Sequence, residues 1–165
     1  SPMPTVNNVT RLLDSKKIPY QAYELPAEKL GAAGSAALLG VPLGQVFKTI
    51  VVQRPAPGKP ILAVIPGDRE VDLKLLAAAA GEKKLHLPTE REAESLTGLQ
   101  AGGISPLALL NKGFQVWLDR AAEQYPEIHI SGGQRGLNLR LAVHSLVDLT
   151  RARLAEISHA SSEDE

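Results

Sequence analysis

The residue best placed for chemistry is a lysine within an otherwise apolar strand. Residues 46–52 read Val-Phe-Lys-Thr-Ile-Val-Val, a β-branched run that is typical of a strand. Strand alternation places Lys48 on one face among apolar neighbours. Because burial of an ammonium group is costly unless the charge is paired, two arrangements are open. Lys48 either extends to water from an edge strand, which this run by itself favours, or lines a pocket and binds a phosphate or carboxylate.

Two glycine-containing segments could hold a small polar ligand against the backbone. They are Gly102-Gly103-Ile104-Ser105-Pro106 and Ser131-Gly132-Gly133-Gln134-Arg135-Gly136. Paired glycines allow a ligand to approach closely, and their N–H groups can stabilise a developing oxyanion. The second segment lacks the Lys-Ser or Lys-Thr ending of a phosphate-binding loop. The alternatives are a tight turn before a helix for the first segment and an exposed hairpin turn for the second.

Several classes of site are disfavoured by the residues present. The chain has no cysteine, which removes disulfides, thiolate metal sites and a cysteine nucleophile. Its four histidines, His86, His129, His144 and His159, lack the spacing of a zinc site. No metal is therefore expected, and each histidine is expected at the surface or at a rim. The sequence contains no Gly-x-Ser-x-Gly motif, and no cofactor is indicated.

Short helices and strands must position these segments. Apolar spacing and capping residues predict helices over 5–17, 35–39, 72–80 and 89–96, and a last helix that starts at the Ser145–Asp148 capping pair and buries Leu154 and Ile157. Strands are predicted over 20–25, 46–52, 60–65, 83–87, 114–118, 128–130 and 137–143, and a loop over 29–34. Because strands and helices do not alternate regularly, the pattern indicates an α+β fold.

Length and charge favour one soluble domain. The chain has 165 residues, with 18 basic and 18 acidic side chains, which is single-domain size and unlike a strongly basic nucleic-acid coat. The domain is expected over residues 4–158, followed by an acidic, disordered tail over 159–165, with residues 1–2 left from cloning. No apolar run is long enough to span a membrane and no signal pattern is present, so a cytoplasmic location is expected.

The three segments, in this order, resemble those of the YbaK/EbsC-type branch of the prolyl-tRNA synthetase editing-domain family. Residues 71–74, 81–84 and 96–98 are also similar to family segments, and the resemblance extends from residue 9 to residue 157. It implies one compact α+β domain with a mixed sheet or a partly closed barrel flanked by helices. It also implies a trans-editing hydrolase that deacylates mischarged tRNA(Pro), above all Cys-tRNA(Pro).

The resemblance also assigns roles to residues. It implies a catalytic site of Lys48, near the 3′-terminal adenosine of the tRNA, with Gly102 and Gly103 as the backbone part of the aminoacyl pocket. The residues that it implies for substrate binding are Thr49, Ile104, Ser105, Ser131, Gly132, Arg135 and Asn138.

The three segments do not pair a nucleophile with a base, as ester hydrolysis usually requires. The resemblance offers the cysteine thiol of the substrate itself as the nucleophile, and an activated water is the alternative. In the first case the protein mainly orients the ester and stabilises charge on oxygen.

Two departures from the family pattern bear on the substrate. Asn138 stands where these deacylases usually have an aspartate after Gly-Leu, and an amide forms hydrogen bonds but carries no charge. Residues 29–32 lack the phenylalanine often found there. The aminoacyl group is therefore expected to be held differently, which leaves alanine and serine open as alternatives to cysteine.

A non-catalytic aminoacyl-tRNA or nucleotide-binding module and a structural partner of a synthetase are the competing hypotheses. The expected partners are the acceptor end of tRNA(Pro) and prolyl-tRNA synthetase. Residues 163–165 are all acidic, so the rest of the chain is net positive. A small positive charge suits brief contact with few phosphates and little sequence readout, for which help from a synthetase is expected.

Overall fold

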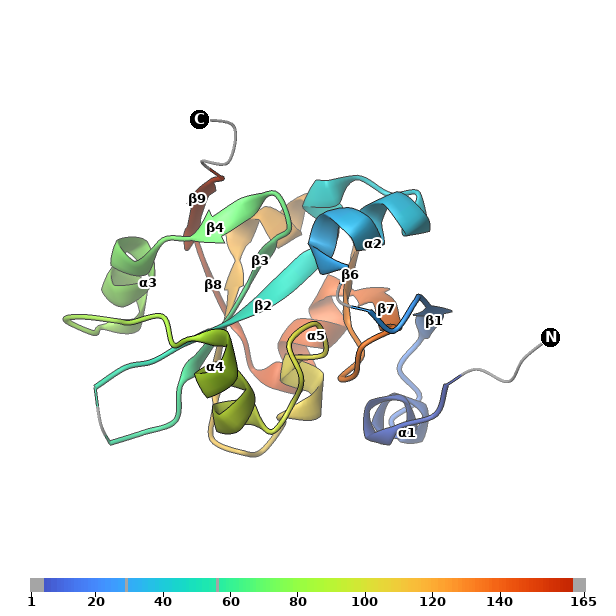
Figure 1. Ribbon diagram of the computed structural model, residues 1–165, viewed down its shortest axis with the longest axis horizontal. Helices are drawn as coiled ribbons and strands as arrows, with labels where there is room; N and C mark the ends of the chain where they lie inside the picture. Colours follow the sequence, from blue (N-terminus) through green and yellow to red (C-terminus); the bar gives the residue numbers. More distant parts are fainter. Residues whose placement is uncertain (1–4, 29, 56, 162–165) are drawn as a thin grey trace.

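Two β-sheets form the centre of the computed structural model, which describes residues 5–28, 30–55 and 57–161 (Figure 1). The four-stranded sheet has the order β2-β3-β5-β8, the three-stranded sheet has the order β1-β7-β6, and β4 pairs with β9. β2 is antiparallel to β3, whereas β3, β5 and β8 are parallel, and the three-stranded sheet is antiparallel. The strands are β1 (Tyr20–Glu24), β2 (Phe47–Val52), β3 (Ile61–Pro66), β4 (Arg69–Val71), β5 (Gln115–Asp119), β6 (Glu127–Ser131), β7 (Leu137–Ala142), β8 (Arg153–Ala155) and β9 (Ser158–Ala160).

Short helices flank the sheets, and most of their ends lie where the sequence predicts. Among the described residues the helices are α1 (Asn8–Ser15), α2 (Gly31–Leu39), α3 (Leu73–Ala80), α4 (Glu90–Thr97) and α5 (Val143–Thr150). Thr89 and Glu92 form the predicted capping box of α4, which satisfies two backbone N–H groups at its start. Gly81 and Gly98 end α3 and α4 in the left-handed conformation. The mixed sheet and flanking helices confirm the α+β class.

Strand β3 lies at the centre of the core and is buried along its whole length. Leu62 and Val64 pack into one apolar cluster with residues of α1, β6 and β7. Ile61, Ala63 and Ile65 face the other way and pack into a second cluster with α3 and Trp117. Burial on both faces explains why β3 is continuously apolar rather than alternating. Among the described strands β2 pairs only with β3, so it lies at the edge of the four-stranded sheet.

The three-stranded sheet has one apolar and one polar face. Ile128 and Ile130 of β6 join the first core cluster with the leucines of β7. The alternate positions carry His129 and Ser131 of β6 beside Asn138 of β7. An isolated parallel bridge between Val46 and His129 connects this sheet to the segment leading into β2. The polar face is thereby placed next to Lys48 and Thr49.

Helix α2 begins earlier than the sequence predicts. The loop expected over 29–34 is helical from Gly31 onward, and residue 29 lies outside the described residues. Alanine has the highest helix propensity, and small side chains allow a close approach to the turn after β3. A Cβ on Gly67 would lie 2.5 Å from Ala32 Cβ, so α2 packs directly on this turn.

The C-terminal part of the chain differs most from the prediction. α5 begins at Val143, and Ser145 is not its cap; the helix ends where Arg151 adopts a left-handed conformation. Leu154 then lies in β8, opposite Leu118 of β5, because parallel pairing with the central sheet replaces helical packing. The expected tail also starts too early, since His159 lies in β9, paired with β4. Residues 1–4 and 162–165 lie outside the described residues.

The strand expected over 83–87 is only a single bridge between Gln53 and His86. Within the described ranges, no helix has both the length and the apolar character that crossing a membrane requires.

Candidate functional site

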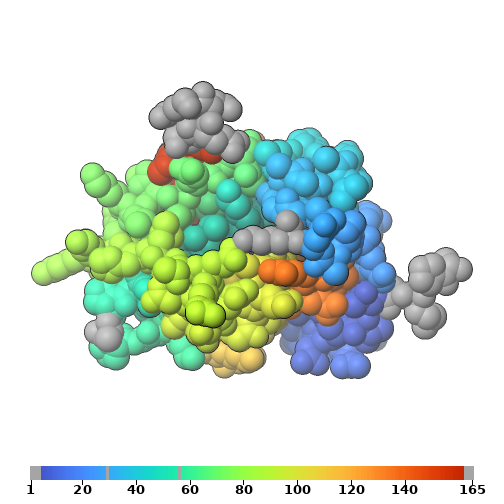
Figure 2. Space-filling model, in the orientation of Figure 1, coloured from blue at the N-terminus to red at the C-terminus, as the bar shows by residue number. Residues whose placement is uncertain are grey.

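A cavity of about 420 Å³ opens along β2 and brings together residues that are far apart in the sequence. Its walls come from β2, from the start of α2, from the segment that leads into α4, and from the two glycine-containing loops. In Figure 2, atoms of the β2–β3 region lie recessed between α2 and the segment around α4. Seven of the sequence-predicted site residues line this cavity: Lys48, Thr49, Gly102, Ile104, Ser131, Arg135 and Asn138.

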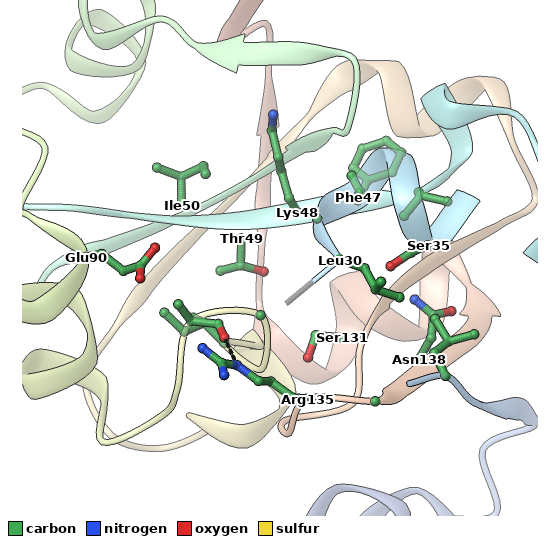
Figure 3. Close-up of a pocket in the computed structure, with 18 of the residues that line it drawn as sticks. Leu30, Ser35, Phe47, Lys48, Thr49, Ile50, Glu90, Ser131, Arg135 and Asn138 are labelled. Atoms are coloured by element: carbon green, nitrogen blue, oxygen red, sulfur yellow. Dashed lines mark hydrogen bonds between the residues drawn. The ribbon is translucent and has the colours of Figure 1, made fainter. Parts of the chain in front are cut away.

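Lys48 combines the two arrangements that the sequence leaves open. It lies on an edge strand, is only partly buried, and also lines the cavity. Its Nζ donates a hydrogen bond to the carbonyl oxygen of Gly67, at 3.3 Å. Figure 3 shows its side chain on the opposite side of β2 from Thr49, whose hydroxyl points toward the glycine-containing loops. The lysine therefore supplies positive charge at one side of the cavity.

Arg135, the second cation of the cavity, also connects the two glycine-containing loops. The Arg135 Nε donates to the carbonyl oxygen of Ala101 at 2.6 Å (Figure 3). This bond lies beside the place where the loops pack most tightly. A Cβ on Gly103 would lie only 2.8 Å from the Cα of Gln134. Gly103 is therefore required for the close packing of the two loops.

The two glycines differ in what their backbone can offer a ligand. The Gly103 N–H donates to the carbonyl oxygen of Gln100 at 2.8 Å. Gly102 lines the cavity with a φ of +89°, and no described group accepts a hydrogen bond from its N–H. The Gly102 N–H can therefore donate to a ligand, whereas the Gly103 N–H is already bonded within its own loop.

Three predicted site residues lie outside the cavity lining. Besides Gly103 they are Ser105 and Gly132. Ser105 is fully buried, and its hydroxyl accepts a hydrogen bond from the Leu107 N–H, where it caps the turn Pro106–Ala108. Gly132 has no room for a side chain, since a Cβ would lie 2.6 Å from Leu137. Both shape the loops that reach the cavity.

The polar wall opposite β2 consists of Ser131 and Asn138. Ser131 Oγ accepts a hydrogen bond from the Gly133 N–H at 3.2 Å, which leaves its own proton for a ligand. Asn138 is 6% exposed, and its Oδ1 lies 2.8 Å from Nδ1 of His129. His129 is 1% exposed, so the expectation of a surface or rim position is wrong for this histidine, whereas the other three are exposed.

Burial keeps His129 neutral. Desolvation is the largest influence and lowers the pKa of its imidazole below the ordinary value, and the charge of Arg140 acts in the same direction. The hydrogen bond with Asn138 and the charge of Glu127 oppose this shift. Because burial disfavours the charged form, the neutral imidazole prevails at neutral pH.

Further lining residues were not identified from the sequence. Leu30, Phe47 and Ile50 supply apolar surface, Ser35 a hydroxyl and Glu90 a carboxylate. Leu30 lies in the segment 29–32 that the resemblance connected with the aminoacyl group, and Phe47 precedes Lys48 in its strand. Nothing in the local sequence marks Ser35, Ile50 and Glu90 as site residues, because the fold alone brings them to the cavity. His129 did carry a signal, since a polar residue between Ile128 and Ile130 in a buried strand requires a partner. Among the described residues, no group of three or more potential metal-binding side chains is found.

Comparisons with known proteins give a consistent result. Residues 28–149 match the family model described as the aminoacyl-tRNA editing domain. EbsC of Enterococcus faecalis, named as a candidate Cys-tRNA(Pro)/Cys-tRNA(Cys) deacylase, is 39% identical over 153 residues, which are 92% of each chain. The proline–tRNA ligase of Nitratidesulfovibrio vulgaris is 35% identical over 74 residues, or 45% of this chain and 12% of the ligase. The crystal structure of a candidate trans-editing enzyme for prolyl-tRNA synthetase superimposes with a TM-score of 0.77 and 26% identity, covering 94% of this chain and 100% of the other.

Proposed function

Because this chain belongs to the family of aminoacyl-tRNA editing domains, whose reaction is hydrolysis of the aminoacyl ester, we propose that its substrate is tRNA(Pro) mischarged with cysteine. The observation that carries this proposal is one cavity containing Lys48, Arg135 and Gly102, whose N–H donates to no described group. The names of EbsC and of the trans-editing structure support the choice of aminoacyl group and tRNA.

The charges of the cavity suit the 3′ end of a charged tRNA. Lys48 and Arg135 lie on different sides of the cavity (Figure 3), where they can bind the phosphate before the terminal adenosine and an oxygen of the ester. Charge-assisted hydrogen bonds of this kind are stronger than neutral ones. The apolar side chains of Leu30, Phe47 and Ile50 offer surface for the adenine or the aminoacyl side chain.

The chemistry that we propose uses the thiol of the substrate. Its sulfur attacks the aminoacyl carbonyl carbon, the ester C–O bond breaks, and the thiol proton passes to the ribose oxygen of the leaving tRNA. A four-membered thiolactone results, and water opens it to free cysteine. In this reaction Gly102 donates its N–H to the developing oxyanion. No histidine is among the described lining residues, and the hydroxyls there lack an adjacent imidazole base, which supports a nucleophile from the substrate.

A water-dependent reaction is the second candidate. Glu28 and Glu90 are lining carboxylates at exposed positions, and a carboxylate can act as a general base toward water. This route does not need a thiol, so it would also remove alanine or serine from tRNA(Pro).

A deacylation panel separates these reactions. We expect release of cysteine from Cys-tRNA(Pro) to be about tenfold faster than release of alanine or serine, the discrimination typical of one small group. Single-turnover assays with the three charged forms of the same tRNA measure this directly. Equal rates for all three would contradict the thiol route and favour water. Saturable binding without turnover of any substrate would contradict deacylation and support a binding module.

Selection of the tRNA body would come from a partner. A cavity of about 420 Å³ suits the 3′ end of a tRNA rather than its body, and phosphate contacts carry no sequence information. The partial match to a proline–tRNA ligase and the name of the trans-editing structure support prolyl-tRNA synthetase as this partner. We accordingly place the reaction at the acceptor end of tRNA(Pro), in the cytoplasm where tRNA is charged.

A further inference from the structure

The buried pair of His129 and Asn138 has a direction that bears on substrate recognition. The atom of Asn138 that lies 2.8 Å from His129 Nδ1 is Oδ1, which can only accept a hydrogen bond. Nδ1 must therefore carry the imidazole proton, and the neutral tautomer has a bare Nε2. That nitrogen is buried without a hydrogen-bond partner among the described residues. A buried lone pair without a partner is tolerable, whereas a buried N–H without an acceptor would be rare in proteins.

With its oxygen held by His129, Asn138 turns its amide nitrogen the other way. Figure 3 shows this nitrogen on the cavity side of the side chain. No described group accepts a hydrogen bond from it, and it is not among the fully buried unpartnered atoms. The cavity wall therefore presents a neutral donor where an aspartate would present a charged acceptor.

We propose that His129 is a positioning residue that fixes the Asn138 amide with its N–H₂ toward the cavity, so that this wall binds an oxygen acceptor of the substrate rather than its cationic amine. The inference rests on the proposed function, because the acceptor is the ester carbonyl or a ribose hydroxyl of the charged 3′ end. A donor at this wall repels an α-ammonium group, which must then lie elsewhere in the cavity.

The groups around His129 keep its imidazole in one neutral tautomer. Glu127 of its own strand, Arg140 of β7 and the ring of Tyr23 of β1 are the charged and titratable groups around it. Glu127 and Arg140 form an ion pair of 2.9 Å with each other, which limits the net field at the imidazole. The tautomer is thus set mainly by burial and by Asn138.

The pH dependence of stability gives a first test. The folded protein holds His129 neutral with a lowered pKa, whereas the unfolded chain takes up a proton near the ordinary value of about 6.5. The free energy of unfolding that this histidine contributes is therefore present above that pH and is lost as the pH falls. We expect the stability difference between wild type and His129→Gln to change between pH 8 and pH 5. Urea unfolding of both proteins measures this difference. The contributions of the exposed histidines cancel, because both proteins contain them. A pH-independent difference would show that His129 is not held neutral.

Binding of a non-hydrolysable analogue gives the decisive test. The probe is adenosine with cysteine linked to its 3′ position through an amide, measured by titration calorimetry. We expect Asn138→Ala to weaken its binding about threefold to tenfold, the value of one neutral hydrogen bond, and Asn138→Asp to weaken it at least as much. Tighter binding by Asn138→Asp than by wild type would overturn the inference, because it would place the amine at this wall.

A double-mutant cycle assigns the role of His129. His129→Leu is expected to weaken analogue binding in the wild-type background but to have no further effect in Asn138→Ala, whereas His129→Gln retains a donor and restores binding. Equal losses in both backgrounds would make His129 merely structural and overturn its positioning role. Ile130→Val, on the apolar face of the same strand, is the control for loss of stability alone.

Nitrogen NMR of the imidazole and the turnover assay make the two proposals separable. A proton on Nδ1 is expected in the folded protein, and a proton on Nε2 would overturn the orientation of Asn138. Binding of the analogue without turnover of any charged tRNA would contradict the proposed function and leave this inference standing.

Discussion

Replacement of Lys48 by alanine is expected to lower kcat/KM for Cys-tRNA(Pro) about 100-fold. A hydrogen bond to a charged group contributes about 1.5–3 kcal/mol, and each 1.36 kcal/mol corresponds to a tenfold change in rate. Lys48 lines the cavity on the edge strand β2, where its ammonium group can reach a phosphate or an ester oxygen. Deacylation under single-turnover conditions measures the loss, and an unchanged rate would remove Lys48 from the site.

Two further variants show whether the loss reflects the charge at this position. Lys48→Arg retains a cation and should recover part of the activity, although its planar group is not equivalent to an ammonium. Lys74→Ala removes an exposed lysine on α3 and should leave the rate unchanged. The melting temperature of Lys48→Ala should remain within a few degrees of wild type, because the Lys48 side chain is only partly buried on an edge strand.

The elements with strong local signals could be predicted from the sequence. The capping box of α4 and the glycines that end α3 and α4 act within a few residues of the chain, so their pattern is visible without the fold. The apolar run of β2 is equally local. By contrast, Leu154 has the spacing of a helical core residue, but parallel pairing of β8 with β5 determines its conformation. Tertiary contacts override local preference in such short segments.

The features of the candidate site also divide into those that the sequence shows and those that depend on the fold. Lys48 and the glycine-containing loops are visible because a cation in an apolar strand and paired glycines are unusual locally. The distinction between Gly102 and Gly103 is not visible, because it depends on which N–H already has an acceptor in Gln100. The partnership of His129 with Asn138 depends on the register of β6 and β7. Sequence patterns identify residue types, whereas the direction of a hydrogen bond requires the pairing of the strands.

Replacement of Gly103 by alanine is expected to affect both stability and activity. Its new Cβ would lie 2.8 Å from Gln134 Cα and 3.0 Å from the Arg135 N atom, and these are backbone atoms that cannot rotate away. The two loops must therefore separate, at a cost of about 1–3 kcal/mol in the free energy of unfolding, as in other overpacked sites. The separation also moves Gly102 and Arg135, and a misplacement of about 1 Å can lower a rate on the order of 100-fold.

Gly98→Ala is the matched control for this prediction. Gly98 has a φ of +72°, and nothing lies within 4 Å of the position of its Cβ, so alanine there costs about 1 kcal/mol of backbone strain without moving a neighbour. We expect a similar loss of stability in urea but an unchanged deacylation rate. If Gly103→Ala unfolds at a lower urea concentration and yet deacylates at the wild-type rate, the contact between the two loops does not position the site. If Gly103→Ala loses far more deacylation activity than Gly98→Ala, the packing of Gly103 on Gln134 holds the N–H of Gly102 where the ester carbonyl must lie.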